Sequence, residues 1–321
     1  MIVIKLVGGL ASQLHKYAVM KSIAKKYNRE FKVDLSAYKN LKENDVMNYG
    51  LHNIKIDPLE ASKKNIKDSK SLTILGRFLY FIVDFLKWVP FFGNFSRKVL
   101  NRLESMPVTK KLIAKSILTI HVSNSSTLDW IEEIVNNENS YIYAEFGLRF
   151  DIIESVRSEL KEVIVNAKIS DHAKFYRDQI EESPISISMH VRRGDYVTNK
   201  KTNDFHGLCG EEYYRKAIGK YKNLEKSTLF LFSDDLYWVK KEFKSFLPKD
   251  TVFVSGNENY EDFSLMANCT NHIIANSGFS AVSAWLSCKN ESNITSPARW
   301  FKDEETNKNQ MEMLPQGWLF L

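Results

Sequence analysis

The stretch that decides the fold is Ile185-Ser-Ile-Ser-Met-His-Val-Arg-Arg-Gly-Asp-Tyr196. Apolar residues occupy every second position up to Val191, with serine or histidine between them, which predicts a β-strand with one buried face. Arg192 and Arg193 follow at the end of this strand, and Gly194 starts a turn. Parallel α/β folds bind ligands where their strands end, and a guanidinium offers a phosphate two parallel charge-assisted hydrogen bonds. The stretch therefore predicts an anion-binding strand end.

Three other interpretations of the arginine pair stay open at this point. Paired arginines are commonly solvated surface residues. Arg193-Gly194-Asp195 also spells a cell-adhesion tripeptide, which needs an exposed loop on a secreted protein. Finally, Arg192 and Asp195 suit a buried ion pair that holds the turn, and such a pair is compatible with a binding role.

Composition indicates a soluble globular protein with one large or two medium domains. The chain has 321 residues, 44% of them hydrophobic and 26% charged, with a net charge of +6. Its basic residues are dispersed, which favours an anionic small ligand or an acidic membrane surface over nucleic acid. Cys209, Cys269 and Cys288 lack the spacing of metal ligands, so we expect a reduced, cytoplasmic protein.

The N-terminus predicts a strand, a glycine turn and a helix. Residues 1–7 form an apolar strand too short for a signal peptide, Gly8 and Gly9 follow, and apolar residues then recur at helical spacing around Gln13. Free N–H groups at a helix start can hold an anion, so Gly8, Gly9 and Gln13 are candidate binding residues. The third glycine of a dinucleotide fingerprint is missing, and plain turn geometry is the alternative.

Residues from about 72 to 120 are expected to form a helical insertion in the N-terminal half. The aromatic stretch 75–92 is interrupted by charges and proline, and its unbroken apolar run, 78–83, is far short of the roughly 20 residues that span a membrane. We expect this stretch to form the core of the insertion. The alternative is an interfacial helix that rests on the cytoplasmic face of the inner membrane.

The second half of the chain predicts a parallel sheet. We place a domain boundary near Pro184, between an N-terminal domain (1–182) and a C-terminal domain (183–321). Strands alternate there with short helices, which is typical of βαβ units. Beyond the arginine strand, the expected strands are 227–232, 251–254 and 272–275, and the expected helices are 211–221, 237–246, 260–269 and 277–287.

Polar residues collect where these strands end. Asp234 could accept hydrogen bonds from the two adjacent donors of guanine, or merely cap the helix that follows it. Ser277 is a good N-cap residue, yet the same helix start would also hold a phosphate. The candidate ligand-binding residues of this half are His190, Arg192, Ser233, Asp234, Asp235, Asn276, Ser277 and Ser280.

Together these features predict a nucleotide diphosphate site without a metal. No Asp-x-Asp sequence, which could chelate a cation, occurs in the chain. Arginine would then neutralise the leaving diphosphate in place of Mg²⁺.

Three segments resemble motifs of the bacterial α-1,2-fucosyltransferases, glycosyltransferase family 11. They are His190-Val-Arg-Arg-Gly-Asp-Tyr196, Phe232-Ser-Asp-Asp235 and Ala275-Asn-Ser-Gly-Phe-Ser280. Matches continue in the same order at Phe205–Cys209 with Tyr213-Tyr214, at Asp262 with Leu265-Met266, and at Ile294–Phe301. The resemblance covers nearly the whole chain and is weakest over 60–140.

The resemblance implies a GT-B-like α/β fold with two Rossmann-like domains. It further implies inverting, metal-independent transfer of L-fucose from GDP-fucose to the 2-OH of galactose in a bacterial surface glycan of the O-antigen (lipopolysaccharide) type. By position, Arg192 would hold the β-phosphate, His190 and the 234–235 pair would lie near the guanosine, and Ser277 and Ser280 near the diphosphate. Arg193 and Asp195 would shape the turn.

The N-terminal loop departs from the family pattern. Ala11, Ser12 and His15 stand where the family has Gly, Asn and Phe, whereas Gln13 is kept. We expect these residues to face the sugar and the acceptor. Colitose, which lacks one hydroxyl of fucose, is therefore an alternative donor sugar, because a smaller residue such as Ser12 would accommodate the loss of a polar partner.

The catalytic base is left open among His206, Asp204 and Glu211, with Arg192 stabilising the departing diphosphate. The expected partners are a GDP-sugar and a galactose-terminated oligosaccharide, either free or lipid-linked, with no cofactor and no nucleic acid. A non-catalytic nucleotide-sugar-binding protein is the competing class.

Overall fold

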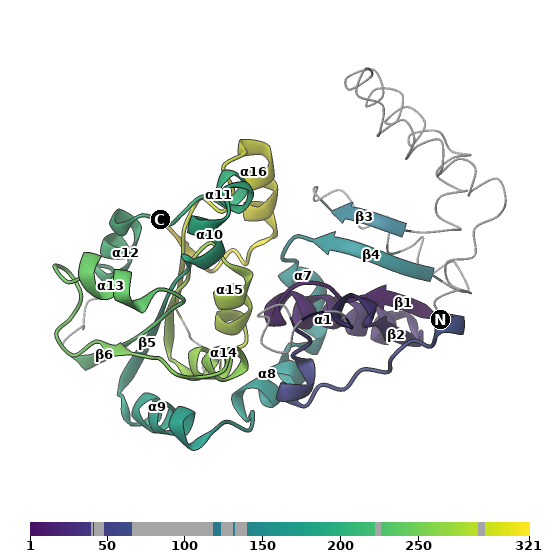
Figure 1. The fold of residues 1–321 in the computed structure, drawn as a ribbon, viewed down its shortest axis with the longest axis horizontal. Coiled ribbons are helices and arrows are strands. Elements are labelled where there is room, and N and C mark those ends of the chain that lie inside the picture. Colours follow the sequence, from purple (N-terminus) through teal and green to yellow (C-terminus); the bar gives the residue numbers. More distant parts are fainter. Residues whose placement is uncertain are drawn as a thin grey trace. The chain divides into compact units, whose positions relative to one another are not determined.

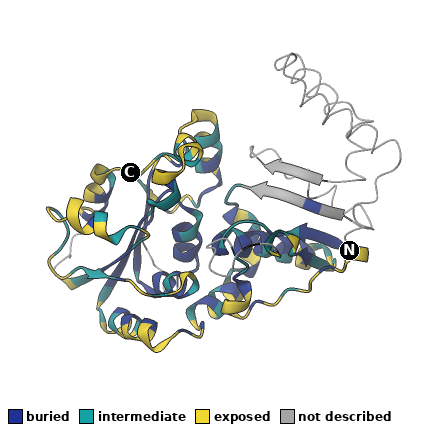
Figure 2. Ribbon diagram, viewed as in Figure 1, coloured by how far each residue is buried: buried dark blue, intermediate teal, exposed yellow. Residues whose placement is uncertain are grey.

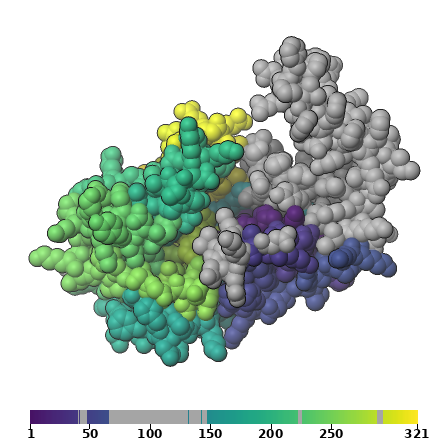
Figure 3. All heavy atoms as spheres, viewed as in Figure 1, coloured from purple at the N-terminus to yellow at the C-terminus, as the bar shows by residue number. Residues whose placement is uncertain are grey.

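The protein is described by a computed structural model that covers residues 1–39, 41, 48–65, 118–122, 131, 140–221, 226–287 and 293–321. The remaining residues are drawn grey in Figure 1 and Figure 3. The aromatic stretch 75–92 and most of the expected helical insertion lie outside the described residues. Among the residues described, no helix is both long and apolar enough to cross a membrane.

Contacts divide the chain into two compact units. One comprises residues 1–7, 23–40 and 58–146, and the other comprises residues 8–22, 41–57 and 147–321. The boundary expected at 182/183 follows a helix, whereas the contacts group residues 147–182 with the second unit. The reason is that two helices of this segment, α8 (Arg157–Val165) and α9 (Asp171–Glu182), pack against α14 (Asn259–Asn268).

The first unit contains the N-terminal sheet, a four-stranded parallel sheet in the order β2-β1-β4-β3. The expected first strand is present, and the side chains of Ile2, Val3 and Ile4 are fully buried. Its strands are β1 (Ile2–Lys5), β2 (Phe31–Asp34), β3 (Leu118–Val122) and β4 (Ser140–Phe146). The helix α1 (Leu10–Tyr27) follows β1 after the predicted glycine turn.

The second unit contains the C-terminal sheet, a six-stranded parallel sheet in the order β10-β9-β8-β5-β6-β7. From β5 the chain adds β6 and β7 on one side and later β8, β9 and β10 on the other, so the strand order reverses at β5. Such a reversal opens a crevice at the carboxyl ends of the strands. The strands are β5 (Ile185–Val191), β6 (Ser227–Ser233), β7 (Val252–Phe253), β8 (Asn271–Ile273), β9 (Ile294–Ser296) and β10 (Leu319–Phe320). The predicted α/β class with two parallel sheets is confirmed.

β5 is buried on both faces, so the predicted single buried face is wrong. Ile187, Met189 and Val191 pack into one apolar core, and the opposite face is buried as well (Figure 2). The polar residues of that face are satisfied inside the protein: the Ser188 hydroxyl lies 2.8 Å from His272 Nδ1. Helices cover both faces of a parallel sheet, so its central strand has no solvent side. Here hydrogen bonds between side chains of neighbouring strands satisfy the polar residues.

The helices after β5 agree with the predicted pattern, with shorter ends. The expected ones are α12 (Glu211–Ile218), α13 (Leu236–Glu242), α14 and α15 (Gly278–Trp285). Three others were not predicted: α10 (Gly194–Thr198), α11 (Lys200–His206) and α16 (Glu304–Met313). α10 starts directly at Gly194, so the turn after the arginine strand is itself helical.

Candidate active site

Arg192 is held between two carboxylates at the carboxyl end of β5. Its Nη2 donates to Asp195 Oδ1 at 2.5 Å, and its Nη1 lies 2.7 Å from Asp234 Oδ2. Asp234 comes from the neighbouring strand end, because Val191 pairs with Ser233. The Arg192 side chain is 31% exposed, so it is oriented by its own chain and still accessible to a ligand. The predicted ion pair with Asp195 is present, but it is partly exposed instead of buried.

Arg193 is built into the protein. Its Nε donates to Asp235 Oδ2 at 3.1 Å, its guanidinium lies 3.5 Å from the Trp238 ring centre, and its side chain is only 15% exposed. A stacked and paired arginine stabilises the turn by packing as well as by charge. This placement agrees with the expectation that Arg193 shapes the turn.

Gly194 allows Asp234 to approach the backbone. A Cβ atom at this position would lie 2.6 Å from Asp234 Oδ2, which is closer than non-bonded atoms tolerate. The same carboxylate accepts a hydrogen bond from the Arg193 backbone N–H at 2.8 Å. The glycine is therefore needed for the carboxylate that orients Arg192.

The first turn of α13 is capped by side chains of the residues that precede it. Asp235 Oδ1 accepts from the Trp238 backbone N–H at 3.1 Å, and the Ser233 hydroxyl accepts from the Asp235 N–H at 3.0 Å. The expectation that Asp234 caps this helix is wrong, because Asp235 fills that place and frees Asp234 for the arginines.

The start of α15, which follows β8, is different. Ser277 occupies the N-cap position, but its side chain accepts no hydrogen bond from the first turn. The Ser280 hydroxyl turns back to the Ser277 carbonyl at 3.3 Å. The N–H groups of a first helical turn have no partner within their helix, so this uncapped start offers them to an anion. β8 pairs with β5, which places the end of β8 beside the strand end that carries Arg192.

Asn276 has a structural role in the described site. Its Nδ2 lies within 3.2–3.4 Å of the carbonyls of His206, Gly207 and Trp300, and its Oδ1 accepts from the Cys209 thiol. The side chain predicted to bind ligand thus ties the segment after α11 to the start of α15.

His190 is a neutral, buried imidazole. Burial, with Arg192 nearby, lowers the pKa of His190 to about 3. Its Nδ1 has no hydrogen-bond partner among the described residues, and its ring lies 5.8 Å from that of Phe279 on α15. Because a buried polar atom without a partner is costly, His190 retains one hydrogen-bonding site for a ligand.

The N-terminal loop around Gly8 and Gln13 lies in the second unit, as does Arg192. Most of the atoms predicted to bind a ligand already form hydrogen bonds within the protein. Gln13 is fully buried and contacts the carbonyls of Gly8 and Asn48 and the N–H of Gly50. Gly8 has a φ of +90°, which suits glycine. Gln13 therefore holds the loop rather than offering a free amide.

The altered residues of this loop divide into two kinds. Ala11 and His15 are buried, and His15 Nε2 accepts from the Arg149 backbone N–H at 2.9 Å. The expectation that both face the substrates is therefore wrong. Ser12 alone is partly exposed, and its hydroxyl lies over Gly8, where an added Cβ would meet it at 3.0 Å.

The three candidate bases occupy distinct environments. Asp204 is exposed on α11, and Glu211 is paired with Arg215 on the surface of α12. His206 stacks on Tyr196 with ring centres 4.9 Å apart, and Tyr196 in turn lies beneath the Arg192 guanidinium. Only His206 is thus connected through the described contacts to Arg192.

The tautomer of His206 leaves one nitrogen available. A ring N–H donates to the Trp300 backbone, whereas Nδ1 has no partner among the described residues. Burial lowers the pKa of His206 below its usual 6.5. The ring is therefore neutral, and Nδ1 can accept a proton.

Asp262 on α14 was overlooked as a site residue. Burial raises its pKa to about 7, although Asn257 Nδ2 donates to its Oδ1 at 2.9 Å. The adjacent Phe263 packs on Phe279 at 5.2 Å, the ring that also contacts His190. Two adjacent carboxylates, Glu261 and Asp262, directly before the apolar residues of this helix were the signal that the sequence offered.

No group of His, Cys, Asp or Glu in the described ranges is arranged to hold a metal ion. The carboxylates at the strand ends are instead engaged by arginines or backbone N–H groups.

Several known proteins are similar to this chain. The chain is 31% identical to an α-1,2-colitosyltransferase of Escherichia coli over 99% of its length and 98% of that protein. It is 30% identical to the O-antigen biosynthesis glycosyltransferase WbnK of Escherichia coli, over 56% of this chain and 63% of the relative. The fucosyltransferase NodZ from Bradyrhizobium gives a TM-score of 0.46 at 15% identity, over 89% of this chain and 93% of that one.

The profile of glycosyl transferase family 11 matches residues 121–321, which include both arginines, the 233–235 segment and the start of α15. With this match over more than half of its length, and a relative similar from end to end, the protein is a glycosyltransferase of family 11.

Proposed function

We propose that the protein is an inverting, metal-independent transferase that moves a deoxy sugar from a GDP donor to the 2-OH of galactose in a bacterial surface glycan. The observation that carries the proposal is the uncapped start of α15 beside Arg192. A diphosphate would be met there by a guanidinium and by free backbone N–H groups, which together neutralise charge without a cation.

The nucleoside is assigned to the neighbouring residues. His190 offers a neutral ring nitrogen inside the unit, and Asp234 lies at the adjacent strand end. Since Asp234 already contacts Arg192 and the Arg193 N–H, we propose that its main role is to orient the arginine that binds the β-phosphate.

The reaction would proceed by loss of GDP from the sugar with attack from the opposite face. The C1–O bond to the β-phosphate breaks, and the negative charge that develops on GDP is stabilised by Arg192 and the α15 start. The acceptor 2-OH forms the new bond to C1 and loses its proton. We propose that His206 Nδ1 takes that proton, because it is the unprotonated nitrogen of a neutral ring.

For the transferred sugar we propose colitose, with L-fucose as the second candidate. The relative that matches the chain from end to end is an α-1,2-colitosyltransferase. The partly exposed Ser12 is the one altered residue of the N-terminal loop that remains accessible. A site that bonds the missing hydroxyl would reject the deoxygenated sugar strongly, so the small side chain favours colitose.

Parallel assays of GDP-colitose and GDP-fucose on a β-galactose-terminated oligosaccharide, in EDTA, test the proposal. We expect turnover of both sugars to be metal-independent and colitose to be preferred. Preference for fucose would reverse the sugar assignment. GDP binding without transfer of either sugar would favour the non-catalytic binder, and dependence on Mg²⁺ or Mn²⁺ would contradict the arginine mechanism. We also propose a cytoplasmic location, with any peripheral membrane contact to be tested by flotation with anionic liposomes.

A further inference from the structure

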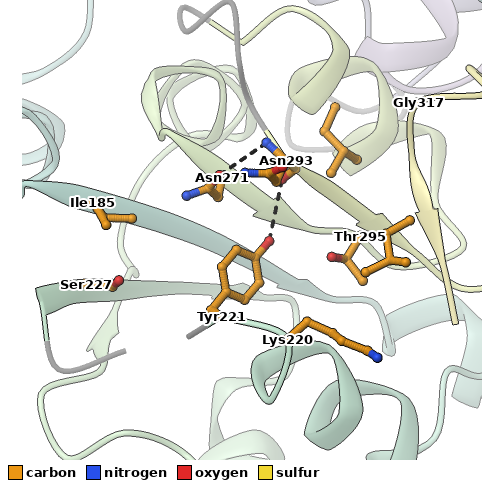
Figure 4. A pocket seen from close by; sticks show the side chains of 10 residues that line it. Ile185, Lys220, Tyr221, Ser227, Asn271, Asn293, Thr295 and Gly317 are labelled. Carbon is orange, nitrogen blue, oxygen red and sulfur yellow. Dashed lines mark hydrogen bonds between the residues drawn. The ribbon is translucent and has the colours of Figure 1, made fainter. Parts of the chain in front are cut away.

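The second unit has a pocket at the edge of the C-terminal sheet opposite the candidate active site. It has a volume of about 340 Å³ and lies where the strands begin (Figure 4). Ile185, Ser227, Asn271 and Ile294 are the first residues of β5, β6, β8 and β9. Small-molecule sites usually measure roughly 300–1,000 Å³, so the pocket is large enough for a small ligand.

The pocket is remote from the proposed chemistry. β5 runs from Ile185 at the pocket to Val191 beside Arg192. At about 3.3 Å per residue, this strand separates the two places by roughly 20 Å. A ligand here could not take part in sugar transfer itself.

A buried amide supplies one polar group of the pocket. Asn271 is 6% exposed, and its Oδ1 accepts from the N–H and the Nδ2 of Asn293, both at 3.1 Å. This arrangement fixes the flip of the amide, and the Asn271 Nδ2 makes no hydrogen bond with a described residue. Because the amide oxygen is already engaged, this pocket-lining side chain can offer its Nδ2 to an oxygen of a ligand.

The rest of the lining combines an aromatic ring, aliphatic walls and further polar groups. The Tyr221 hydroxyl donates to the carbonyls of His272 and Asn293 at 3.3 and 3.5 Å, which fixes the ring at the pocket (Figure 4). Ile185, Ile294 and Leu319 provide apolar surface, and Lys220, which forms no ion pair with a described residue, lies at the rim.

We infer that this pocket binds a neutral sugar unit of a glycan. A pyranose presents apolar C–H faces and a rim of hydroxyl groups, which matches a lining of tyrosine and isoleucine with amide and lysine donors. A phosphate would demand more charge, because one exposed lysine is the only cation among the lining residues. The inference rests on the proposed action on glycans.

Such a site would strengthen the binding of long acceptors. A glycan that occupies the pocket and the catalytic edge at once is held at two points, so the second contact forms at a high effective concentration. A short acceptor can occupy only one of the two places and would gain nothing.

Amide spectra of the full chain labelled with ¹⁵N-glycine provide a site-resolved test. Gly317 lines the pocket, and Gly219 directly precedes the lining residue Lys220. Gly194 and Gly278 mark the active-site edge. We expect millimolar lactose or N-acetyllactosamine to shift the Gly317 and Gly219 signals saturably even with excess GDP, whereas inorganic phosphate should not. GDP alone should shift the signals of Gly194 and Gly278. If GDP is not the donor nucleotide, these two signals stay unchanged, whereas if the pocket binds no sugar, the signals of Gly317 and Gly219 stay unchanged.

Two variants of Gly317 sharpen this experiment. A Cβ at Gly317 meets nothing within 4 Å, so Gly317→Ala should keep the fold and identify the signal by its loss. Gly317→Trp should fill the pocket, abolish the lactose shift at Gly219 and leave the GDP shifts at Gly194 and Gly278 intact. It should also raise the KM of a long galactose-terminated glycan about tenfold, with the KM of lactose unchanged.

No saturable shift at Gly317 and Gly219 with either sugar would overturn the inference. So would a response to phosphate alone, or a lactose shift at Gly219 that persists in Gly317→Trp.

Discussion

The two helices that follow the neighbours of β5 begin in opposite ways. At the start of α13, the Asp235 carboxylate accepts a hydrogen bond from the Trp238 backbone N–H. At the start of α15, the Ser277 side chain accepts no hydrogen bond from the helix. Both positions are strand-to-helix turns at the same edge of one sheet, so topology alone does not distinguish them. The difference teaches that, of these two helix starts, the α15 start keeps its N–H donors for another partner, because a capped start has already used its donors.

The turnover rate should depend on His206, which lies on the α15 side of this sheet edge. His206 is tied to it because its carbonyl accepts from Asn276, the residue before Ser277. Replacement of His206 by Ala should lower kcat by about 10²–10⁴-fold, the usual contribution of a positioned base, with little change in GDP affinity. Steady-state kinetics and calorimetry measure the two effects.

The control is His172→Ala, which removes a histidine of α9 that contacts the Ser255 carbonyl and should leave kcat unchanged. Because the pKa of His206 lies below 6.5, the acidic limb of the wild-type rate profile should also lie below pH 6.5. A loss of less than tenfold would move the base to Asp204 or Glu211.

GDP affinity should depend on Arg192 far more than on Arg193. Removing one charged hydrogen-bonding group costs roughly 1.5–3 kcal/mol, so Arg192→Ala should weaken GDP about ten- to hundredfold in calorimetry with EDTA. Arg193→Ala should instead lower the thermal stability, since this side chain is stacked on Trp238. Equal losses of affinity in the two variants would break the comparison between the ligand-facing and the structural arginine.

Converting the α15 start into an α13-like start should exclude the anion. In Ser277→Asp, a carboxylate would cap the first turn and repel a phosphate, so we expect about tenfold weaker GDP binding. The same change should stabilise the protein by up to ~1 kcal/mol. Urea titration and calorimetry separate these effects, and Ser277→Ala serves as the uncharged control. Unchanged GDP affinity in Ser277→Asp would place the diphosphate elsewhere.

The reverse change at α13 should alter stability alone. Asp235→Ala removes an N-cap, which typically costs about 0.5–2 kcal/mol, and it also removes the partner of Arg193. We expect a lower unfolding midpoint in urea and GDP affinity within about twofold of wild type, because Asp234, directly before this helix, still occupies Arg192 and would repel a phosphate. A large loss of GDP binding would mean that both helix starts serve the nucleotide.

A separate prediction concerns Asp262 and pH. Its pKa is raised from 3.8 to about 7 in the folded protein, so the folded state binds this proton more tightly than the unfolded state does. The resulting stabilisation is fully present below pH 4 and is lost as the pH rises through 7. The melting temperature of wild type relative to Asp262→Asn should therefore fall between pH 5 and pH 8. A difference that is constant with pH would contradict the raised pKa.

The sequence was informative where short-range pattern and topology agree. Alternation and the strand-end arginines predicted β5, Arg192 and the parallel sheet, because both depend on neighbouring residues and on a general rule for α/β folds. It was less informative about which of two adjacent aspartates would cap α13, since that choice depends on the backbone of Gly194 approaching Asp234 from another strand.

Burial was the harder quantity to predict. The serines and His190 of β5 read as a solvent-facing set, yet they are buried. Helices cover both faces of a parallel sheet, and the ring of Phe279 on α15 lies 5.8 Å from that of His190. His15 could not be assigned from the sequence either, because its partner Arg149 is distant in the chain. Contacts of long sequence separation decide such positions, and local periodicity carries no information about them.

The enclosure of Arg192 by Asp195 and Asp234 has a consequence for selectivity. With Arg193 neutralised by Asp235 as well, carboxylates outnumber guanidinium groups at this strand end, so the empty site does not project a positive potential into solvent. Nucleic acids and other polyanions in a cell would find little long-range attraction there. Association with a GDP-sugar should accordingly be only weakly slowed by added salt, because recognition begins at contact distance, where the α15 N–H groups first become accessible to the diphosphate.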